Sequence, residues 1–306
     1  MKATVNNNLL DILIEKGHLI STGVKGVYGK GKDMQLLLTN LENYICHKGR
    51  TQNTEIMTFP PVMSKKSIET KEYVKSFPHL LGTINSFFGN ETNYKELVEK
   101  VVENKEWTEE YTSTEVVMTP AACYPVYPSL SGTLPKGGRV VEVSSFCFRH
   151  EPSDEPTRML SFKMLEYVVA GTPDEVTTWR QNWIDKAQDI LQELKLEFNI
   201  IVADDPFFGK GGKMLKVNQK ESQLKYEMVV PVNSLEKPTA VISSNYHQDL
   251  FSKKHNILTS VNQYAHTSCL AFGLERLAIA LMKKHGMSFS EWPESVVNLL
   301  KLNTKS

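Results

Sequence analysis

The sequence predicts an α+β fold in which a mainly antiparallel sheet is covered by helices. Segments rich in valine, isoleucine and phenylalanine, which favour strands, gather after residue 110. Segments with apolar residues at helical spacing are scattered around them instead of alternating with them. Regular alternation of strand and helix is typical of a parallel α/β sheet, so this distribution favours an antiparallel sheet with helices packed on it.

Composition places the chain among ordinary globular proteins. Its 306 residues are 41% hydrophobic and 23% charged, which allows one sizeable core. Lysine plus arginine and aspartate plus glutamate number 35 each, so nothing indicates a broad polyanion-binding surface, which argues against tRNA binding by this chain alone. The start of the chain lacks the apolar core of a signal peptide, and no run of about 18 apolar residues occurs. We therefore expect a cytoplasmic protein without a membrane partner.

The first 120 residues are expected to be mostly helical. Helices are expected at 7–16, 33–45, 65–74 and 94–107, and strands at 55–62 and 115–120. In the fourth helix the inward residues are expected to be Leu97, Val98, Val101 and Val102. The glycine-rich segment 23–32 lacks the Gly-x-x-x-x-Gly-Lys-Ser/Thr order of a phosphate-binding loop and is interpreted as a plain turn. The apolar segment 76–89 is interpreted as irregular.

A long helix with a clear start signal follows in the second half of the chain. Residues 172–175 form a capping box with proline at the first helical position, and an inward apolar stripe continues to Leu194. Beyond it, strands are expected at 199–203, 225–230 and 239–244. The segment 266–286 is interpreted as a strand that turns at Gly273 into a helix ended by Gly286.

A charged hairpin is expected between residues 140 and 169. Two apolar strands, 140–148 and 162–169, flank a loop that contains two prolines. Alternation would place Arg149 and Glu151 on one face of the outgoing strand and Glu166 among apolar residues of the return strand. An ionised side chain on a half-buried sheet is costly unless it meets a partner, a metal or a charged ligand. The sheet face is therefore expected to bind a ligand.

Four cysteines indicate no disulfide framework. They are widely spaced and form no paired pattern: Cys46, Cys123, Cys147 and Cys269. Their spacing leaves free thiols and scattered metal ligands as alternatives.

Three segments resemble the signature motifs of class II aminoacyl-tRNA synthetases. They are Phe59-Pro-Pro-Val62, Phe148-Arg-His-Glu151 with its loop and return strand, and Gly273-Leu-Glu-Arg276 at a strand-to-helix junction. Three further sequence segments, which begin at Tyr73, Met118 and Ser244, resemble segments of the amino acid:[carrier protein] ligases. These ligases are truncated relatives of the seryl-tRNA synthetases. The resemblance covers residues from about 17 to 286 and implies one class II synthetase-like catalytic domain, residues 1–306, without a tRNA-binding arm.

The resemblance implies a two-step reaction. A small amino acid, with glycine or alanine expected, would be activated with ATP to an aminoacyl-adenylate and transferred to the phosphopantetheine thiol of a carrier protein. It also implies a homodimer whose two-fold interface is formed by the helix and strand of the first motif.

The resemblance also assigns residues to ATP. Arginine suits this role because its permanent charge and rigid fork of donors hold phosphates. Arg149 would contact the α-phosphate and the amino-acid carboxylate, Arg158 the far phosphates, and Arg276 the other side of ATP, with Arg149 and Arg276 as the catalytic residues. The other expected ATP-binding positions are Glu151, at the adenine amino group, Met159, Glu227 and Ala240. Glu227 is a candidate ligand of the magnesium ion that accompanies ATP, and the alternative is an ordinary strand position opposite Lys225.

A zinc site is implied by the resemblance and not by spacing. Cys123, Glu166 and Cys269 coincide with the residues that hold zinc in this family, whereas lone cysteines are more often small buried hydrophobes, as Cys147 is expected to be. One zinc ion per subunit with three protein ligands would leave one tetrahedral position for the substrate amino group. Zinc would thereby orient the amino acid instead of activating water.

Several neighbouring residues have two interpretations. With Glu166, Asn245 and His247 are expected to bind the amino acid, although His247 is equally consistent with a hydrogen-bonded loop histidine. Glu275 is either a ligand contact or a buried partner of an arginine. The basic segment 209–216, with Lys220 and Lys225 after it, is either a solvated loop or a docking site for an acidic carrier protein.

Two other functions stay open. One is a seryl-type synthetase that acts on tRNA, against which stand the neutral charge and the lack of a long charged heptad arm. The other is a non-catalytic paralogue that binds an amino acid or nucleotide, against which stand the intact arginines and the three expected zinc ligands.

Overall fold

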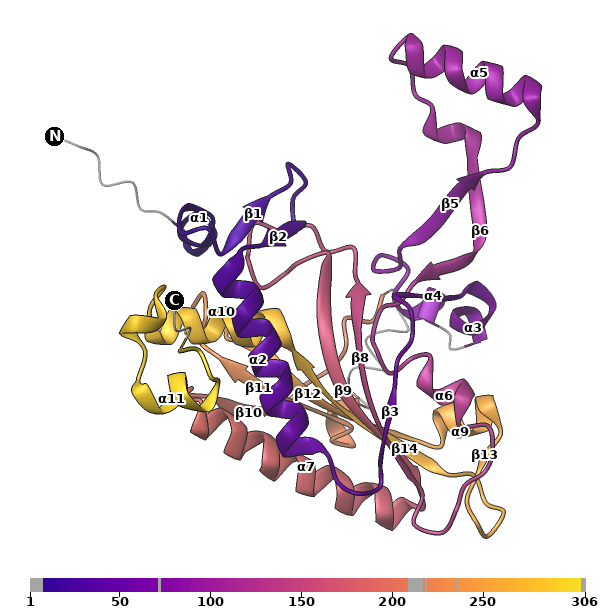
Figure 1. Ribbon diagram of the computed structural model, residues 1–306. Coiled ribbons are helices and arrows are strands. Elements are labelled where there is room, and N and C mark those ends of the chain that lie inside the picture. The colour runs from indigo at the N-terminus through magenta and orange to yellow at the C-terminus, as the bar shows by residue number, and fades with distance from the viewer. Residues whose placement is uncertain (1–7, 71–72, 209–216, 218, 235, 304–306) are drawn as a thin grey trace, which may run out of the picture.

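The computed structural model describes residues 8–70, 73–208, 217, 219–234 and 236–303. Its centre is a sheet of seven described strands in the order β10-β11-β12-β14-β9-β8-β3 (Figure 1). The strands are β3 (Thr54–Met57), β8 (Arg139–Phe148), β9 (Ser161–Gly171), β10 (Asn199–Val202), β11 (Lys225–Val230), β12 (Thr239–Gln248) and β14 (His266–Gly273). Every neighbouring pair is antiparallel except β3 and β8. The expected mainly antiparallel sheet is therefore confirmed.

Three long helices cover one face of this sheet, which we call the back face (Figure 1). They are α2 (Lys32–Gly49), α7 (Pro173–Glu193) and α10 (Leu274–His285). Leu165, Tyr167 and Phe272 point from the strands into this layer and belong to its core. The predicted capping box starts α7, since Thr172 and Glu175 each bond the backbone amide of the other. The chain adds α1 (Leu9–Glu15), before the sheet, and α11 (Glu294–Leu299), after it.

The opposite face, which we call the front face, carries a smaller apolar cluster. Val141, Val168 and Ala271 of the sheet pack there with Tyr127 and Phe251. These two rings come from the short helices α6 (Val126–Ser129) and α9 (Leu250–His255), near the short pair β7 (Gly132–Thr133) and β13 (Ile257–Leu258). The thinner cover leaves room for polar residues on this face.

A separate arm projects from the body (Figure 1). It contains a three-stranded sheet of β4 (Val62–Ser64), β5 (Thr83–Phe87) and β6 (Tyr111–Met118), with α3 (Lys65–Thr70), α4 (Tyr73–Ser76) and, at the tip, α5 (Glu91–Val102). Two predictions were wrong here. The segment 76–89 contains strand β5, and none of the four apolar residues expected to face inward from α5 is buried, with Val102 73% exposed. The helix has an apolar stripe, but no layer of the body lies beneath it.

The glycine-rich segment 23–32 is a turn only in its first half. Residues 23–27 belong to the turn between β1 (Leu19–Ser21) and β2 (Tyr28–Lys30), which pair antiparallel in a ribbon beside the start of α2 (Figure 1). The expectation of a plain turn was wrong for residues 28–30, which form a strand. The basic segment 209–216, by contrast, lies outside the described residues. The described helices include none with the length and apolar character needed to cross a membrane. All four cysteines are free and buried.

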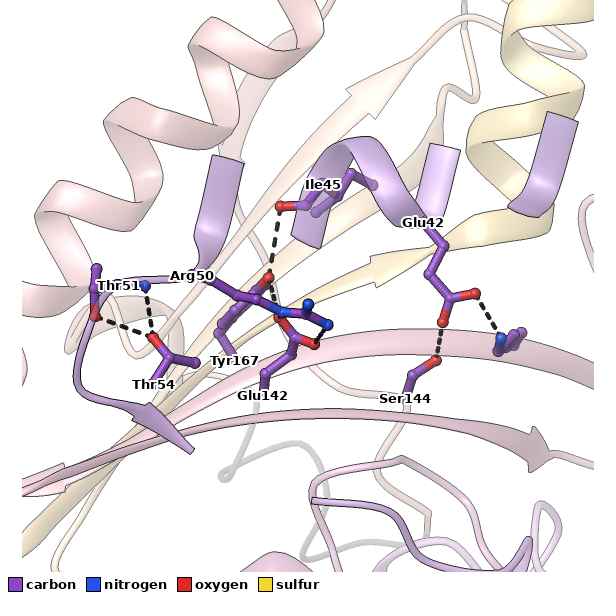
Figure 2. A network of polar contacts seen from close by, with 9 residues as sticks. Glu42, Ile45, Arg50, Thr51, Thr54, Glu142, Ser144 and Tyr167 are labelled. Atoms are coloured by element: carbon purple, nitrogen blue, oxygen red, sulfur yellow. Dashed lines mark hydrogen bonds and ion pairs between the residues drawn. The ribbon is translucent and has the colours of Figure 1, made fainter. Parts of the chain in front are cut away.

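A network of polar contacts fastens α2 to the hairpin β8–β9 (Figure 2). Glu142, only 3% exposed, accepts two bonds from Arg50 at 2.9 and 2.7 Å and one from the hydroxyl of Tyr167 at 2.7 Å. Nearer the start of α2, Glu42 accepts from the Ser144 hydroxyl and from the Lys163 ammonium group. Burial alone would raise the pKa of Glu142, but the bonds from Arg50 and Tyr167 outweigh it, so this pKa is lowered.

Replacing Arg50 with methionine is expected to lower the free energy of unfolding by about 2 kcal/mol at neutral pH. The loss is smaller than for a fully buried pair because the Arg50 side chain is 46% exposed and Tyr167 still bonds Glu142. Since folding lowers the pKa of Glu142, this stabilisation is present above the pKa of a free glutamate and disappears as the pH falls through the folded value. Urea unfolding of both proteins should show a difference that shrinks in acid, and a difference independent of pH would contradict this account.

Candidate metal and nucleotide site

The structure brings Cys123, Glu166 and Cys269 together. Their ligand atoms all lie within 4.8 Å of one another, and all three residues are buried. Glu166 lies on β9, and Cys269 lies on β14 opposite Val168, two residues along the same front face of β9. Cys123 arrives from the loop between β6 and α6, where its backbone amide donates to Glu166 Oε1 at 3.1 Å. Residues separated by 43 and 103 positions thus form one cluster because two adjacent strands and one loop meet.

The protonation of this cluster fits a cation site. Burial, and then the nearby Cys269, raise the pKa of Glu166 to about 8. A bond from Cys123, which keeps its proton, lowers the pKa of Cys269. Three acidic groups are therefore crowded in an apolar setting with little positive charge among them, and a divalent cation would relieve this arrangement. Two thiolates and one carboxylate are a donor set that zinc accepts.

Asn245 and His247 approach the same cluster from β12. The Asn245 side-chain amide donates to Cys269 Sγ at 3.7 Å, and His247 Nε2 lies 3.9 Å from the same sulfur. Asn245 is directly opposite Cys269 in the strand ladder, so its place on the front face follows from register. His247 also contacts Thr267 Oγ1 through Nδ1 at 3.2 Å. Both residues predicted to line the amino-acid pocket are next to the cluster.

Arg149 lies at the junction between this cluster and the hairpin loop. Strand β8 ends at Phe148, so alternation along the strand, which we had used to orient Arg149 and Glu151, does not set their direction. Instead, Arg149 Nε donates to the carbonyl of Pro120 at 2.9 Å, three residues before Cys123. Its guanidinium group also lies 5.6 Å from the centre of the Phe162 ring. The positive charge of Arg149 acts on Glu166 and on Arg276 alike.

The hairpin loop holds Arg158 beside two carboxylates. Its Nε bonds Glu155 at 3.1 Å, and its Nη1 lies 3.7 Å from Glu151. The side chain is half exposed and able to exchange these carboxylates for another anion. The next residue, Met159, is 4% exposed and packs in the back-face core, so only its backbone remains for a ligand.

Arg276 is fixed by two carbonyl groups. Its Nε donates to Thr157 and its Nη1 to Ala240, both at 3.0 Å, which joins the hairpin loop to β12. Burial lowers the pKa of Arg276, and the charges of Arg149 and Arg158 lower it further. In the described part of the chain, neither Arg149 nor Arg276 has a carboxylate within 4 Å, although Glu151 and Glu227 are near enough to influence Arg276. This concentration of positive charge is suited to a polyanion such as a nucleotide triphosphate.

Glu275 has a different role from its neighbour in the sequence. It is 3% exposed and accepts from the backbone amide of Lys163 at 2.8 Å, and Lys30 Nζ lies 3.3 Å from its other oxygen. It is a buried partner, as one of our two interpretations expected, but its partners are a lysine and a backbone amide instead of an arginine.

A buried lysine on β11 was missed by the sequence analysis. We had grouped Lys225 with the basic loop, yet it is 8% exposed and lies 2.7 Å from Asp205 and 2.9 Å from Glu227. Glu227 thus forms an ion pair with Lys225 of the same strand on the front face. Its side chain is 21% exposed, so it is partly buried and not an ordinary surface position. Polar residues at alternating positions 225 and 227 of an otherwise apolar strand were the signal available.

Comparison with known proteins places the chain among ligases. No family model matches it. Two proteins of Bradyrhizobium diazoefficiens, amino acid--[acyl-carrier-protein] ligases 1 and 2, are 42% and 41% identical to it over 284 and 282 residues. These matches cover 92% of this chain and 87% and 84% of the two ligases. The chain belongs to the amino acid--[acyl-carrier-protein] ligase family. The resemblance found in its motifs is thereby confirmed.

This chain shares its fold with seryl-tRNA synthetases. The type-2 serine--tRNA ligase of Methanococcus aeolicus is 29% identical over 189 residues, which are 59% of this chain and 36% of that protein. Among solved structures, M. kandleri seryl-tRNA synthetase bound to A. aeolicus tRNASec matches with a TM-score of 0.82 at 20% identity, over 97% of this chain and 60% of that one. The Pyrococcus horikoshii enzyme complexed with ATP matches with 0.68 at 16% identity, over 96% and 63%. The predicted class II synthetase-like fold is confirmed.

Proposed function

We propose that this protein activates a small amino acid with ATP and transfers it to an acyl-carrier protein. The names of the two Bradyrhizobium ligases support the overall reaction. In the first step, a carboxylate oxygen of the amino acid attacks the α-phosphorus, the bond to the bridging oxygen breaks, and pyrophosphate leaves. In the second, the phosphopantetheine sulfur, having lost its proton, attacks the carbonyl carbon of the adenylate and AMP leaves.

One observation carries the first step: the charge of Arg149 acts both on Glu166 of the metal cluster and on Arg276. An amino acid held at Cys123, Glu166 and Cys269 would have its carboxylate directed toward Arg149, whose charge influences both Glu166 and Arg276. Arg276 and Arg158 would hold the phosphates and neutralise the charge that develops on pyrophosphate. Positioning two reactants in this way accounts for much of the acceleration available to such a reaction.

Zinc is the metal we propose for the cluster, one ion per subunit. Held by Cys123, Glu166 and Cys269, it would keep one tetrahedral position for the neutral amino group of the substrate. Asn245 and His247 support the Cys269 sulfur and would line the same pocket. Glu227, whose Oε1 lies 2.9 Å from Lys225 Nζ, is the proposed ligand for magnesium with ATP. Glu151 and the backbones of Met159 and Ala240 complete the proposed nucleotide contacts.

We further propose that residues 1–306 work as one catalytic domain in a cytoplasmic homodimer. The two-fold interface would include α2 and β3, and β3 is an edge strand of the main sheet. A tRNA substrate is the second candidate, favoured only by the likeness to seryl enzymes. Incubation of the purified protein and adenylate with carrier protein or with tRNA should label the carrier protein, and labelling of tRNA alone would reverse this choice.

Amino-acid-dependent ATP/pyrophosphate exchange tests the first step. We expect exchange with glycine or alanine and little with larger amino acids. We also expect its loss after exhaustive chelation and its return when zinc is added. Absence of exchange with every amino acid would overturn the enzymatic proposal, and exchange that survives complete metal removal would overturn the assignment of zinc.

A further inference from the structure

The β1–β2 ribbon contacts two elements of the proposed ATP site. Its turn, residues 22–27, meets the hairpin loop that carries Arg158, and its second strand meets the start of α10, which carries Arg276. We propose that this ribbon is a clamp that sets the positions of these two arginines for ATP. The inference rests on the proposed adenylation reaction and assigns a role to the glycine-rich segment, which sequence analysis interpreted only as a turn.

The first contact of the clamp is made by Gly26. Its carbonyl accepts from the backbone amide of Leu160 at 2.8 Å, two residues after Arg158. A Cβ atom at Gly26 would lie 3.1 Å from Leu160 Cγ and 3.4 Å from its backbone nitrogen, so only glycine allows this approach without displacement. Lys25 adds an ion pair to Asp154 of the same loop at 2.7 Å. The turn therefore contacts the hairpin loop on both sides of Arg158 in the sequence.

The second contact is the buried pair of Lys30 and Glu275. Their charged atoms lie 3.3 Å apart, and their side chains are only 15% and 4% exposed. Glu275 also accepts from the backbone amide of Lys163 on β9, so one carboxylate joins the ribbon, the return strand and α10. Arg276 follows directly in the chain and bonds Thr157 in the hairpin loop. The ribbon thus contacts both the loop that carries Arg158 and the helix that carries Arg276.

Two glycines of one turn offer a matched test. Gly23 and Gly26 both have φ of +81°, so alanine strains the backbone equally at either position, but a Cβ at Gly23 meets nothing within 4 Å. Gly26→Ala should raise the KM for ATP in pyrophosphate exchange by about tenfold relative to Gly23→Ala, because small displacements of positioning groups carry large rate effects. The KM for the amino acid should change little in either variant. Equal KM values for ATP in the two variants would overturn the clamp.

A second pair of variants keeps the test decisive if Gly26→Ala fails to fold. Lys30→Met should raise the KM for ATP, and Lys30→Arg should restore it, since a cavity of about 140 Å³ lined by Lys30, Lys163 and Glu275 has room for the longer side chain. A merely structural lysine would lower the melting temperature without this selective change in KM. The wild-type protein separates the two proposals. If it shows no exchange with any amino acid, the proposed adenylation reaction is wrong. If it shows normal exchange and the variants have the same KM for ATP as the wild type, only the clamp is refuted.

Discussion

Replacing Arg276 with methionine is expected to lower amino-acid-dependent pyrophosphate exchange by about a thousandfold, the scale seen when an arginine that stabilises a transferring phosphoryl group is lost. Its guanidinium group lies with Arg149 and Arg158 where the triphosphate is proposed to bind. The main effect should fall on kcat, because negative charge grows on the leaving pyrophosphate during the reaction. Steady-state exchange kinetics would measure it.

Arg180 provides the matched control for this loss. It too is a partly buried arginine that donates to groups of the sheet region, at 3.2 Å to Ser244 Oγ and 3.0 Å to the carbonyl of Gln223. However, it belongs to α7 on the back face and is not among the residues proposed to contact the nucleotide. Arg180→Met should therefore lower stability while leaving kcat close to wild type. If both variants lose exchange to the same degree, Arg276 acts through folding and the proposed role is wrong.

The main sheet was predictable because the local sequence of its strands carries recognisable signals. The hairpin β8–β9 and the strand-to-helix turn at Gly273 follow from β-branched runs and glycine positions, which the structure reproduces. The three metal-site residues were found through the family resemblance and not through spacing, because the ladder of β9 and β14 brings them together. Register between strands distant in the chain is a tertiary property that local periodicity does not contain.

Other features depended on partners that the pattern did not reveal. An apolar stripe at helical spacing predicts an amphipathic helix, and α5 is one, but the pattern does not say whether a surface covers the stripe. Lys225 was read as part of a basic run because its two carboxylate partners, Asp205 and Glu227, become neighbours only when β11 and the preceding loop meet. The direction of Arg149 was likewise set by the carbonyl of Pro120 beyond the end of its strand.

The second large effect is expected at the cluster of Cys123, Glu166 and Cys269. Cys269→Ala should remove bound zinc almost completely and lower exchange by at least about a hundredfold, more than is usual for changes outside the ligand set. The physical reason is that only two protein donors, Cys123 and Glu166, remain, and the burial that raises the pKa of Glu166 still disfavours the charged carboxylate. Metal analysis of the purified variant gives a readout that is independent of activity.

Cys147→Ala is the control that separates metal binding from packing. Cys147 is 1% exposed, close to the 2% of Cys269, and deletion of its sulfur leaves a comparable space in the same front-face core. Its sulfur, however, contacts the carbonyl of Ser145 and belongs to no metal cluster found among the described residues. This variant should keep its zinc and its exchange activity at a reduced melting temperature. Equal zinc content in the two variants would show that the cluster does not hold the metal, because Cys269 is one of its proposed ligands and Cys147 is not.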